Sequence, residues 1–158
     1  DGNSFDSGSE CWETCAHHVK NPCNFPFSTG YFCPTDEDYR KRTVVYGYNQ
    51  ITKKCEAYTY YGCGGYGNRF NTRKDCWKRC GGTSKCAQTA SGAGGAYWRY
   101  YYDIDSDTCK SAMYFYASTN GVNRFYTHEE CNDECRAIYS GLSLYLTHLG
   151  LCGRYGNI

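Results

Sequence analysis

The stretch GCGGYGNRFNTRKDCWKRC, residues 62–80, decides the fold because part of its pattern occurs twice in the chain. Its Asn68-Arg69-Phe70 returns fifty-five residues later as Asn123-Arg124-Phe125. After each phenylalanine the next two cysteines lie at the same distances, six and ten residues on. These cysteines are Cys76 and Cys80 in the first copy, and Cys131 and Cys135 in the second. Such a repeat predicts two homologous modules in tandem.

The segments around this motif predict the same elements in both modules. Before it, aromatic and polar residues alternate on both sides of a turn, which is typical of a β-hairpin. The four segments concerned are 44–49, 55–61, 97–102 and 109–116. Each motif ends in two cysteines four residues apart, which a helix places on one face. Thr127, with Glu130 three residues later, forms a capping box that marks the start of the second helix.

Composition indicates an oxidising compartment. Thirteen of the 158 residues are cysteine, and there are eighteen tyrosines and seven phenylalanines. Aromatic rings must then supply most of the buried area, and disulfides must add the stability that so small a core lacks. Because thiols stay oxidised outside the cytosol, we expect a secreted, extracellular protein. The chain begins at Asp1 with polar residues, so we expect a mature product from which the signal peptide has been removed.

The cysteine spacing resembles that of a known family. Gly62-Cys63, followed after six residues by Phe70 and after five more by Cys76, resembles the signature of the Kunitz (pancreatic trypsin inhibitor) family, and residues 23–30 resemble its N-terminal loop. The resemblance implies a small disulfide-rich α+β fold with two tandem Kunitz domains, each a twisted β-hairpin with a C-terminal α-helix. The expected divisions are an N-terminal extension (1–22), domain 1 (23–80), a linker (81–85), domain 2 (86–136) and a C-terminal extension (137–158). The linker is flexible by composition.

The resemblance also implies a disulfide pairing, one of the fifteen that six cysteines allow. The implied pairs are Cys23–Cys80, Cys33–Cys63 and Cys55–Cys76 in domain 1, and Cys86–Cys135 and Cys109–Cys131 in domain 2. In domain 2, however, Ser118 stands where the family has the cysteine that tethers the binding loop. Residues 90–96, which include Gly94 and Gly95, replace that loop and offer no large side chain to a specificity pocket.

Domain 1 departs from the family at the residue that would enter a protease. A Kunitz inhibitor presents its P1 side chain directly after the tethering cysteine, and here that residue is Pro34, whose ring and fixed φ suit an S1 pocket poorly. The longer loop that follows carries Arg40, Lys41 and Arg42, each able to pair with the aspartate of a trypsin-like S1 pocket. A long loop loses preorganisation, so the alternative is a solvated charge run beside residues 36–38.

Three cysteines lie outside the implied framework, namely Cys11, Cys15 and Cys152. Because thirteen is odd, one thiol must stay free, be capped or link a second chain, so we expect a monomer or a disulfide-linked dimer. We expect Cys152 to pair with Cys11 or Cys15. His17 and His18 follow Cys15 closely, but cysteines used as disulfides in an oxidising compartment predict no metal site, and we expect no cofactor.

The C-terminal extension carries a series of leucines: Leu142, Leu144, Leu146, Leu149 and Leu151. Their spacing fits a strand at first and a helix later, so it leaves the conformation open. The extension is too short and too polar to span a bilayer, and we expect no membrane partner. We expect it to pack on domain 2 as a lid; the alternative is an apolar patch for a partner.

Charge and motifs exclude several classes of function. Residues 1–85 carry twelve basic and nine acidic side chains, and residues 86–158 carry five and seven, which is too little basic excess for nucleic-acid binding. No catalytic motif is present, so we expect no enzyme. Tandem domains with extra cysteines and degenerate loops resemble tick salivary anticoagulants. We therefore expect inhibition of a host haemostatic serine protease, of the thrombin or factor Xa class, by non-standard contacts. The alternative is a non-protease host target, such as a complement or immune protein, a platelet receptor or an ion channel.

Overall fold

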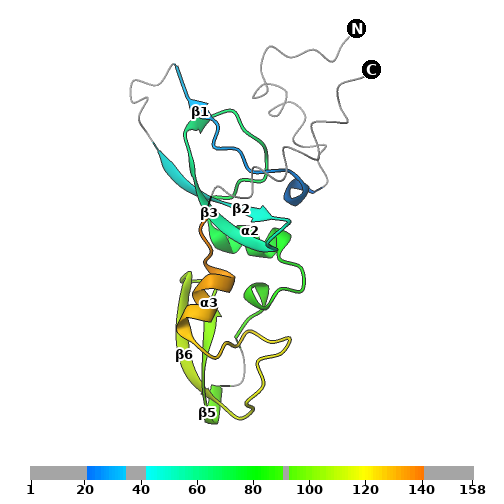
Figure 1. Ribbon diagram of the computed structural model, residues 1–158, viewed down its shortest axis with the longest axis vertical. Coiled ribbons are helices and arrows are strands. Elements are labelled where there is room, and N and C mark those ends of the chain that lie inside the picture. The colour runs from blue at the N-terminus through cyan, green and yellow to red at the C-terminus, as the bar shows by residue number, and fades with distance from the viewer. Residues whose placement is uncertain (1–20, 35–41, 91–92, 141–158) are drawn as a thin grey trace.

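The computed structural model describes residues 21–34, 42–90 and 93–140. In chain order the elements are η2 (Pro22–Asn24), β1 (Tyr31–Phe32), β2 (Thr43–Asn49), β3 (Lys54–Tyr60), β4 (Gly62–Cys63), α2 (Arg73–Cys80), η3 (Lys85–Ala87), β5 (Ala93–Asp103), β6 (Thr108–Tyr114) and α3 (His128–Cys135). Two bodies follow one another along the long axis, β1 to β4 with α2 in domain 1, and β5, β6 and α3 in domain 2 (Figure 1). The predicted α+β fold class, with a hairpin and a helix in each module, is confirmed.

The two hairpins share their register and their turn. β2 pairs antiparallel with β3, and β5 with β6, so that a tyrosine faces the first cysteine of the return strand in each: Tyr48 opposite Cys55, and Tyr102 opposite Cys109. Two residues before that cysteine the backbone is left-handed, at Lys53 (φ 60°) and at Asp107 (φ 49°). The repeat seen in the sequence is therefore a repeat of backbone geometry.

The asparagine of each Asn-Arg-Phe motif explains why the motif recurs. Asn68 is fully buried, accepts a hydrogen bond from the Tyr48 N–H at 2.8 Å and donates to the Tyr48 carbonyl at 2.8 Å and the Phe25 carbonyl at 2.7 Å. Asn123 repeats these contacts with Tyr102 and with the Gln88 carbonyl. One amide side chain thus joins the hairpin to the N-terminal segment and provides hydrogen-bond partners for three backbone groups.

Hydroxyl caps start both helices. The Thr72 hydroxyl oxygen accepts from the Asp75 N–H, and that of Thr127 accepts from the Glu130 N–H, each at 3.0 Å. The Glu130 carboxylate in turn accepts from the Tyr126 N–H at 2.9 Å. The predicted capping box is therefore present, except that the Glu130 carboxylate accepts from the N–H of Tyr126 rather than from that of the cap residue Thr127.

Five disulfides hold these elements together, in the pairing that the family resemblance implies. They join Cys23 to Cys80, Cys33 to Cys63, Cys55 to Cys76, Cys86 to Cys135 and Cys109 to Cys131. The remaining cysteines, Cys11, Cys15 and Cys152, lie outside the described residues. Aromatic side chains and cystines fill the core, and Val45 is the one aliphatic residue among the buried hydrophobic residues of the described ranges.

One core runs through both domains. Its buried members are Cys55, Cys76, Trp77, Cys86, Tyr102, Phe125, Cys131 and Cys135. Trp77 of α2 has no exposed surface and donates its indole N–H to the Cys135 carbonyl of domain 2 at 3.1 Å. The two domains therefore bury part of their apolar surface against each other.

The linker between the domains is packed at its first residue, Gly81, which differs there from the expected flexible segment, whereas Gly82 and Thr83 are exposed. Gly81 is buried and donates its N–H to the Trp77 carbonyl at 2.8 Å. A Cβ at Gly81 would come within 2.5 Å of that same carbonyl oxygen and 2.9 Å of the Ala87 Cβ. Glycine stands here because the close approach of the two domains leaves no room for a side chain, whereas composition alone suggests freedom.

The start of the C-terminal extension also differs from expectation, since it packs on domain 1. Residues 137–140 run beside β3, where Ala57 donates to the Ala137 carbonyl at 3.0 Å and accepts from the Tyr139 N–H at 2.9 Å. The Tyr139 ring meets Phe27 edge-on, with 5.0 Å between centroids. The physical reason is that β3 has an unpaired edge that a following strand-like segment can satisfy. Leu142 to Leu151 lie outside the described residues.

Alkaline conditions should unfold the protein through its buried tyrosines. Burial raises the pKa of Tyr58 and of Tyr102 far above the ordinary value. Since the phenolate form is disfavoured only in the folded state, the stability from both groups is complete below about pH 10 and is lost as pH rises above it. We expect a phenolate absorbance titration to show a late fraction of tyrosines that ionises only as the circular dichroism signal of the fold disappears. Tyr58→Phe should reduce that fraction, and ionisation of every tyrosine within the folded state would contradict the prediction.

Candidate functional site

The Cys33–Cys63 disulfide marks the end of domain 1 where the family resemblance implies the binding loop. It joins β1 to the end of β4, with 5.1 Å between the Cα atoms, and β1 and β4 pair antiparallel. Pro34 follows directly and is exposed. Figure 1 shows β1 at the end of the molecule remote from domain 2. The structure therefore exposes Pro34, which stands where the family resemblance implies the P1 residue.

Aromatic residues and one arginine surround this disulfide. Tyr31 is 52% exposed and Phe32 is 39% exposed. Phe32 lies against Tyr61, with 4.7 Å between ring centroids, and the Arg42 guanidinium lies 5.7 Å from the Tyr61 centroid. We call Tyr31, Phe32, Tyr61 and Arg42 the aromatic rim. Aromatic residues and arginine contribute a large share of the binding energy in protein interfaces.

The structure describes only part of the loop predicted to bind. Pro34 and Arg42 lie at the two ends of the segment and are both exposed. Arg40 and Lys41 lie outside the described residues, as do Asp36 to Asp38. The sequence pointed to the three basic residues and overlooked Tyr31, Phe32 and Tyr61. Their positions beside Cys33 and Cys63 were the available signal.

Domain 2 holds its corresponding end without a disulfide. The Arg99 guanidinium donates from Nε and Nη2 to the Ala117 carbonyl, at 3.0 and 2.9 Å. The Ser118 hydroxyl accepts from the Asn120 N–H at 3.3 Å. Arg99 also lies over the Tyr126 ring, 4.7 Å from its centroid. A guanidinium therefore ties β5 to the segment in which the family would have its tethering cysteine.

Gly94 and Gly95, predicted as part of a replacement binding loop, belong to strand β5 instead. The register of β5 with β6 shifts between Ala93 and Tyr97, so the glycines form an irregularity in the strand. A Cβ on Gly95 would lie 2.6 Å from the Phe115 backbone nitrogen and Cα. With φ of 100° at Gly95, glycine is required by both conformation and space. The Gly/Ala composition thus allows the strand to close onto its neighbour and leaves no protruding loop over residues 93–96.

The described residues contain no candidate for a metal centre or a membrane span. No group of three or more His, Cys, Asp or Glu side chains in residues 21–34, 42–90 and 93–140 is placed to hold a metal ion. In the same ranges no helix has the length and apolar character that crossing a bilayer would require. His17 and His18 lie outside them. The described surface carries exposed aromatic rings and charged side chains that can contact another molecule.

Comparison with known proteins agrees with this geometry. The model of the Kunitz/bovine pancreatic trypsin inhibitor domain matches twice, over residues 22–81 and 85–136. "Kunitz-type serine protease inhibitor bitisilin-3" of Bitis gabonica is 33% identical over 137 residues, which cover 83% of this chain and 85% of that protein. "Carboxypeptidase inhibitor SmCI" of Sabellastarte magnifica is 31% identical over 138 residues, covering 84% and 75%.

Two further matches show how far the likeness extends. Papilin of Drosophila melanogaster is 33% identical over 85% of this chain, but the match spans only 5% of papilin itself. Ixolaris, in an NMR structure of its interaction with Factor X, is 28% identical, with a TM-score of 0.29, and the match covers 75% of this chain and 97% of that one. The two matches to the family model cover most of the chain and coincide with the two hairpin-and-helix bodies. The chain therefore belongs to the Kunitz/bovine pancreatic trypsin inhibitor family and carries two of its domains in tandem.

Proposed function

We propose that this protein is secreted and inhibits a trypsin-like serine protease of a host's haemostatic system, of the thrombin or factor Xa class. Family membership supports inhibition, and a similar protein, bitisilin-3, is named a serine protease inhibitor. The resemblance to tick salivary anticoagulants supports the haemostatic class. In this proposal the aromatic rim makes the main contact and Pro34 stays out of the S1 pocket.

The exposed position of Pro34 beside the aromatic rim carries the proposal. A proline side chain offers no charge to the aspartate of a trypsin-like S1 pocket, so affinity has to come from neighbouring groups. Tyr31 and Phe32 supply large apolar area on a two-residue strand that the Cys33–Cys63 disulfide holds in place. Such preorganisation reduces the entropy lost when a partner binds.

An amidolytic panel of clotting proteases, with trypsin included, tests the proposal. We expect the unaltered protein to inhibit one of the clotting proteases. The double variant Tyr31→Ala, Phe32→Ala should raise the inhibition constant at least about 30-fold, as removal of two interface anchors does. Pro34→Ala should change the inhibition constant less than about threefold, since Pro34 makes no specific contact in this arrangement.

The matched pair of variants separates the two modes of binding. Insertion of Pro34 into the active site predicts the reverse order, with Pro34→Ala the more harmful change. Because Tyr31, Phe32 and Pro34 are exposed, both variants should keep the amide spectrum of the folded protein. Absence of inhibition of every protease at micromolar concentration of the unaltered protein rules the proposal out.

A second candidate is a Kunitz scaffold that binds a non-protease host protein. It is favoured by domain 2, where Gly94 lies against the Phe115 ring, Gly95 lies against the Phe115 backbone, and Ser118 stands in place of the tethering cysteine. Over residues 93–118 domain 2 therefore has no tethered loop of the kind on which standard protease inhibition depends. Capture of partners from host plasma, identified by mass spectrometry, distinguishes the two candidates: a protease zymogen supports the first, and a complement protein or receptor fragment supports the second.

A further inference from the structure

The two domains differ at one pair of matched positions. Phe27 lies four residues after the first cysteine of domain 1, and Ala90 lies four residues after the first cysteine of domain 2. Tyr58 and Ala112 correspond in the same way, each three residues after the first cysteine of the return strand. In domain 1 the Phe27 and Tyr58 rings stack, with 5.1 Å between centroids and 13° between planes. Domain 2 has alanine at both positions and no such ring pair.

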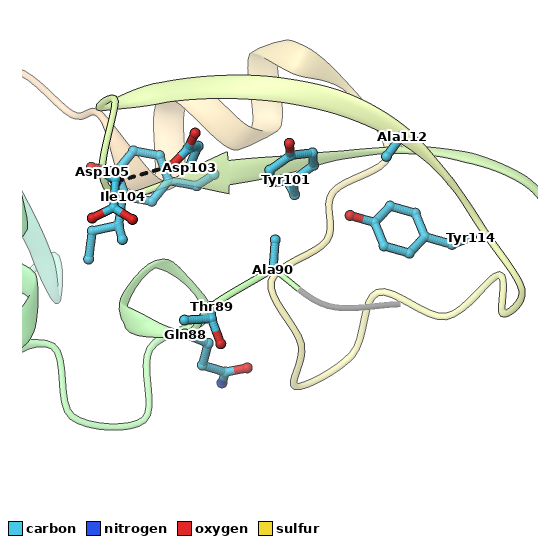
Figure 2. A pocket seen from close by; sticks show the side chains of 10 residues that line it. Gln88, Thr89, Ala90, Tyr101, Asp103, Ile104, Asp105, Ala112 and Tyr114 are labelled. Atoms are coloured by element: carbon cyan, nitrogen blue, oxygen red, sulfur yellow. Dashed lines mark hydrogen bonds between the residues drawn. The ribbon is translucent and has the colours of Figure 1, made fainter. Parts of the chain in front are cut away.

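The missing rings leave a groove in domain 2. It has a volume of about 450 Å³ and lies between the outer face of the β5–β6 hairpin and the segment before β5. The lining residues are Gln88, Thr89, Ala90, Tyr101, Tyr102, Asp103, Ile104, Asp105, Ala112 and Tyr114. Figure 2 shows Ala90 on one side, Tyr101, Ala112 and Tyr114 on the other, and the two aspartates at one end. The groove thus has a mixed lining of alanine, tyrosine and uncharged polar side chains, with two carboxylates at one end.

The acidic end is already balanced by lysines. Lys110 hydrogen-bonds to the Asp103 carboxylate and lowers its pKa to about 2. Asp105 pairs with Lys74 of α2, at 2.6 Å. The Asp105 side chain is nevertheless 74% exposed, so its remaining oxygen lone pairs face solvent at the mouth of the groove. A cation entering the groove meets carboxylates and competes there with flexible lysines.

We infer that this groove receives an arginine side chain of a partner protein. Its aliphatic stem would lie between Ala90 and Ala112, in the space that the ring pair fills in domain 1, and its planar guanidinium would reach Tyr101 and Asp105. A guanidinium stacks on tyrosine and forms a two-point hydrogen bond with a carboxylate, whereas an ammonium group does neither as well. The inference goes beyond the proposed function, because the groove lies in domain 2, apart from the aromatic rim, and it applies to protease and non-protease partners alike.

A nuclear magnetic resonance titration of the full chain with blocked arginine, Nα-acetyl-arginine methylamide, tests the inference directly. We expect saturable shifts at the amides of Tyr101, Asp105 and Ala112, with a Kd of about 1–10 mM, as befits a single side chain. The uncharged isostere, acetyl-citrulline methylamide, should bind at least about fivefold more weakly because it forms no ion pair. Absence of saturable shifts overturns the inference, and so does equal binding of the citrulline, lysine or phenylalanine methylamide.

Three variants test the site without depending on one another. Ala90→Phe fills the groove with the ring that domain 1 has and should abolish the shifts. Asp105→Asn and Lys74→Gln each remove the ion pair between these two residues. If loss of that ion pair perturbs the fold, both variants should change arginine binding in the same way. We expect Asp105→Asn to weaken arginine binding about threefold to tenfold, and Lys74→Gln to strengthen it, because it removes the competing cation. A change in the same direction for both would assign the effect to the fold and overturn the inference.

Discussion

Replacing Trp77 by alanine should lower the free energy of unfolding by about 3–5 kcal/mol, the range found for large buried aromatic side chains. Trp77 is fully buried in the core that both domains share, and its indole N–H bonds to the Cys135 carbonyl across the interface. The variant loses the packing and also leaves that carbonyl without its donor. Urea denaturation with the disulfides intact, followed by circular dichroism, measures the change.

A control variant, Trp98→Ala, and the number of unfolding transitions make this prediction specific to the interface between the domains. Trp98 is 55% exposed, so Trp98→Ala should cost less than about 1 kcal/mol. Because the core is continuous, the unaltered protein should unfold in one transition, and Trp77→Ala should separate it into two as the domains lose their common packing. A Trp77→Ala variant as stable as Trp98→Ala would refute the shared core, as would two transitions in the unaltered protein.

Arg73→Met should cost about 3 kcal/mol, because it removes the hydrogen bonds to the Cys55 and Ala137 carbonyls and the ion pair with Asp107, and the buried Cys55 carbonyl loses its arginine donor. Arg73 is 5% exposed, and its Nη1 donates to the Cys55 carbonyl at 2.6 Å and the Ala137 carbonyl at 2.8 Å. Its Nε lies 3.2 Å from the Asp107 carboxylate of domain 2, and its guanidinium lies 4.8 Å from the centroid of the Tyr46 ring. One side chain thus joins β3, the β5–β6 turn and the start of the C-terminal extension. Thermal and urea unfolding measure the loss.

Lys54→Met is the matched control, because Lys54 also reaches domain 2. Its ammonium lies 3.5 Å from the Glu134 carboxylate and donates to the Asp133 carbonyl, but both side chains of the ion pair are partly exposed. Solvent screening should hold the cost of Lys54→Met below about 1 kcal/mol. Equal costs for Arg73→Met and Lys54→Met would show that burial of Arg73 has no energetic importance.

Local features of the fold were predictable because they depend on residues close together in the chain. Alternation over 44–49 and 97–102 reflects the two faces of a strand, and Thr127 with Glu130 reflects the geometry of one helical turn. The disulfide pairing was available only through the family resemblance, since spacing by itself left fifteen pairings for domain 1. The role of Asn68 could not be predicted, because its three hydrogen bonds reach residues 20 and 43 positions away.

The candidate site was predicted in part. Pro34 and Arg42 are exposed at the end of domain 1, as the position of Cys33 suggests. The family resemblance predicts a loop at Gly94 and Gly95 because residues 90–96 stand where the family has its binding loop, yet the absence of side chains lets β5 pack against Phe115. Glycine-rich composition is compatible with a flexible segment and with a segment packed too tightly for side chains, so composition cannot distinguish the two. Only the position of Phe115 in space distinguishes the two.

The sequence alone determined that the chain has two modules, that each consists of a hairpin and a helix, and that the second helix begins with a capping box; the family resemblance added that domain 2 lacks one loop tether. These properties follow from repeat spacing, from the alternation of side chains and from residue identity, which can all be read from the linear sequence. Only the tertiary structure decided that the modules share a core through Trp77 and Arg73, that Arg99 replaces a tether, and that Ala90 and Ala112 open one groove. The reason is that burial and cavity volume belong to surfaces in contact, and residues far apart in sequence come into contact only once the chain has folded.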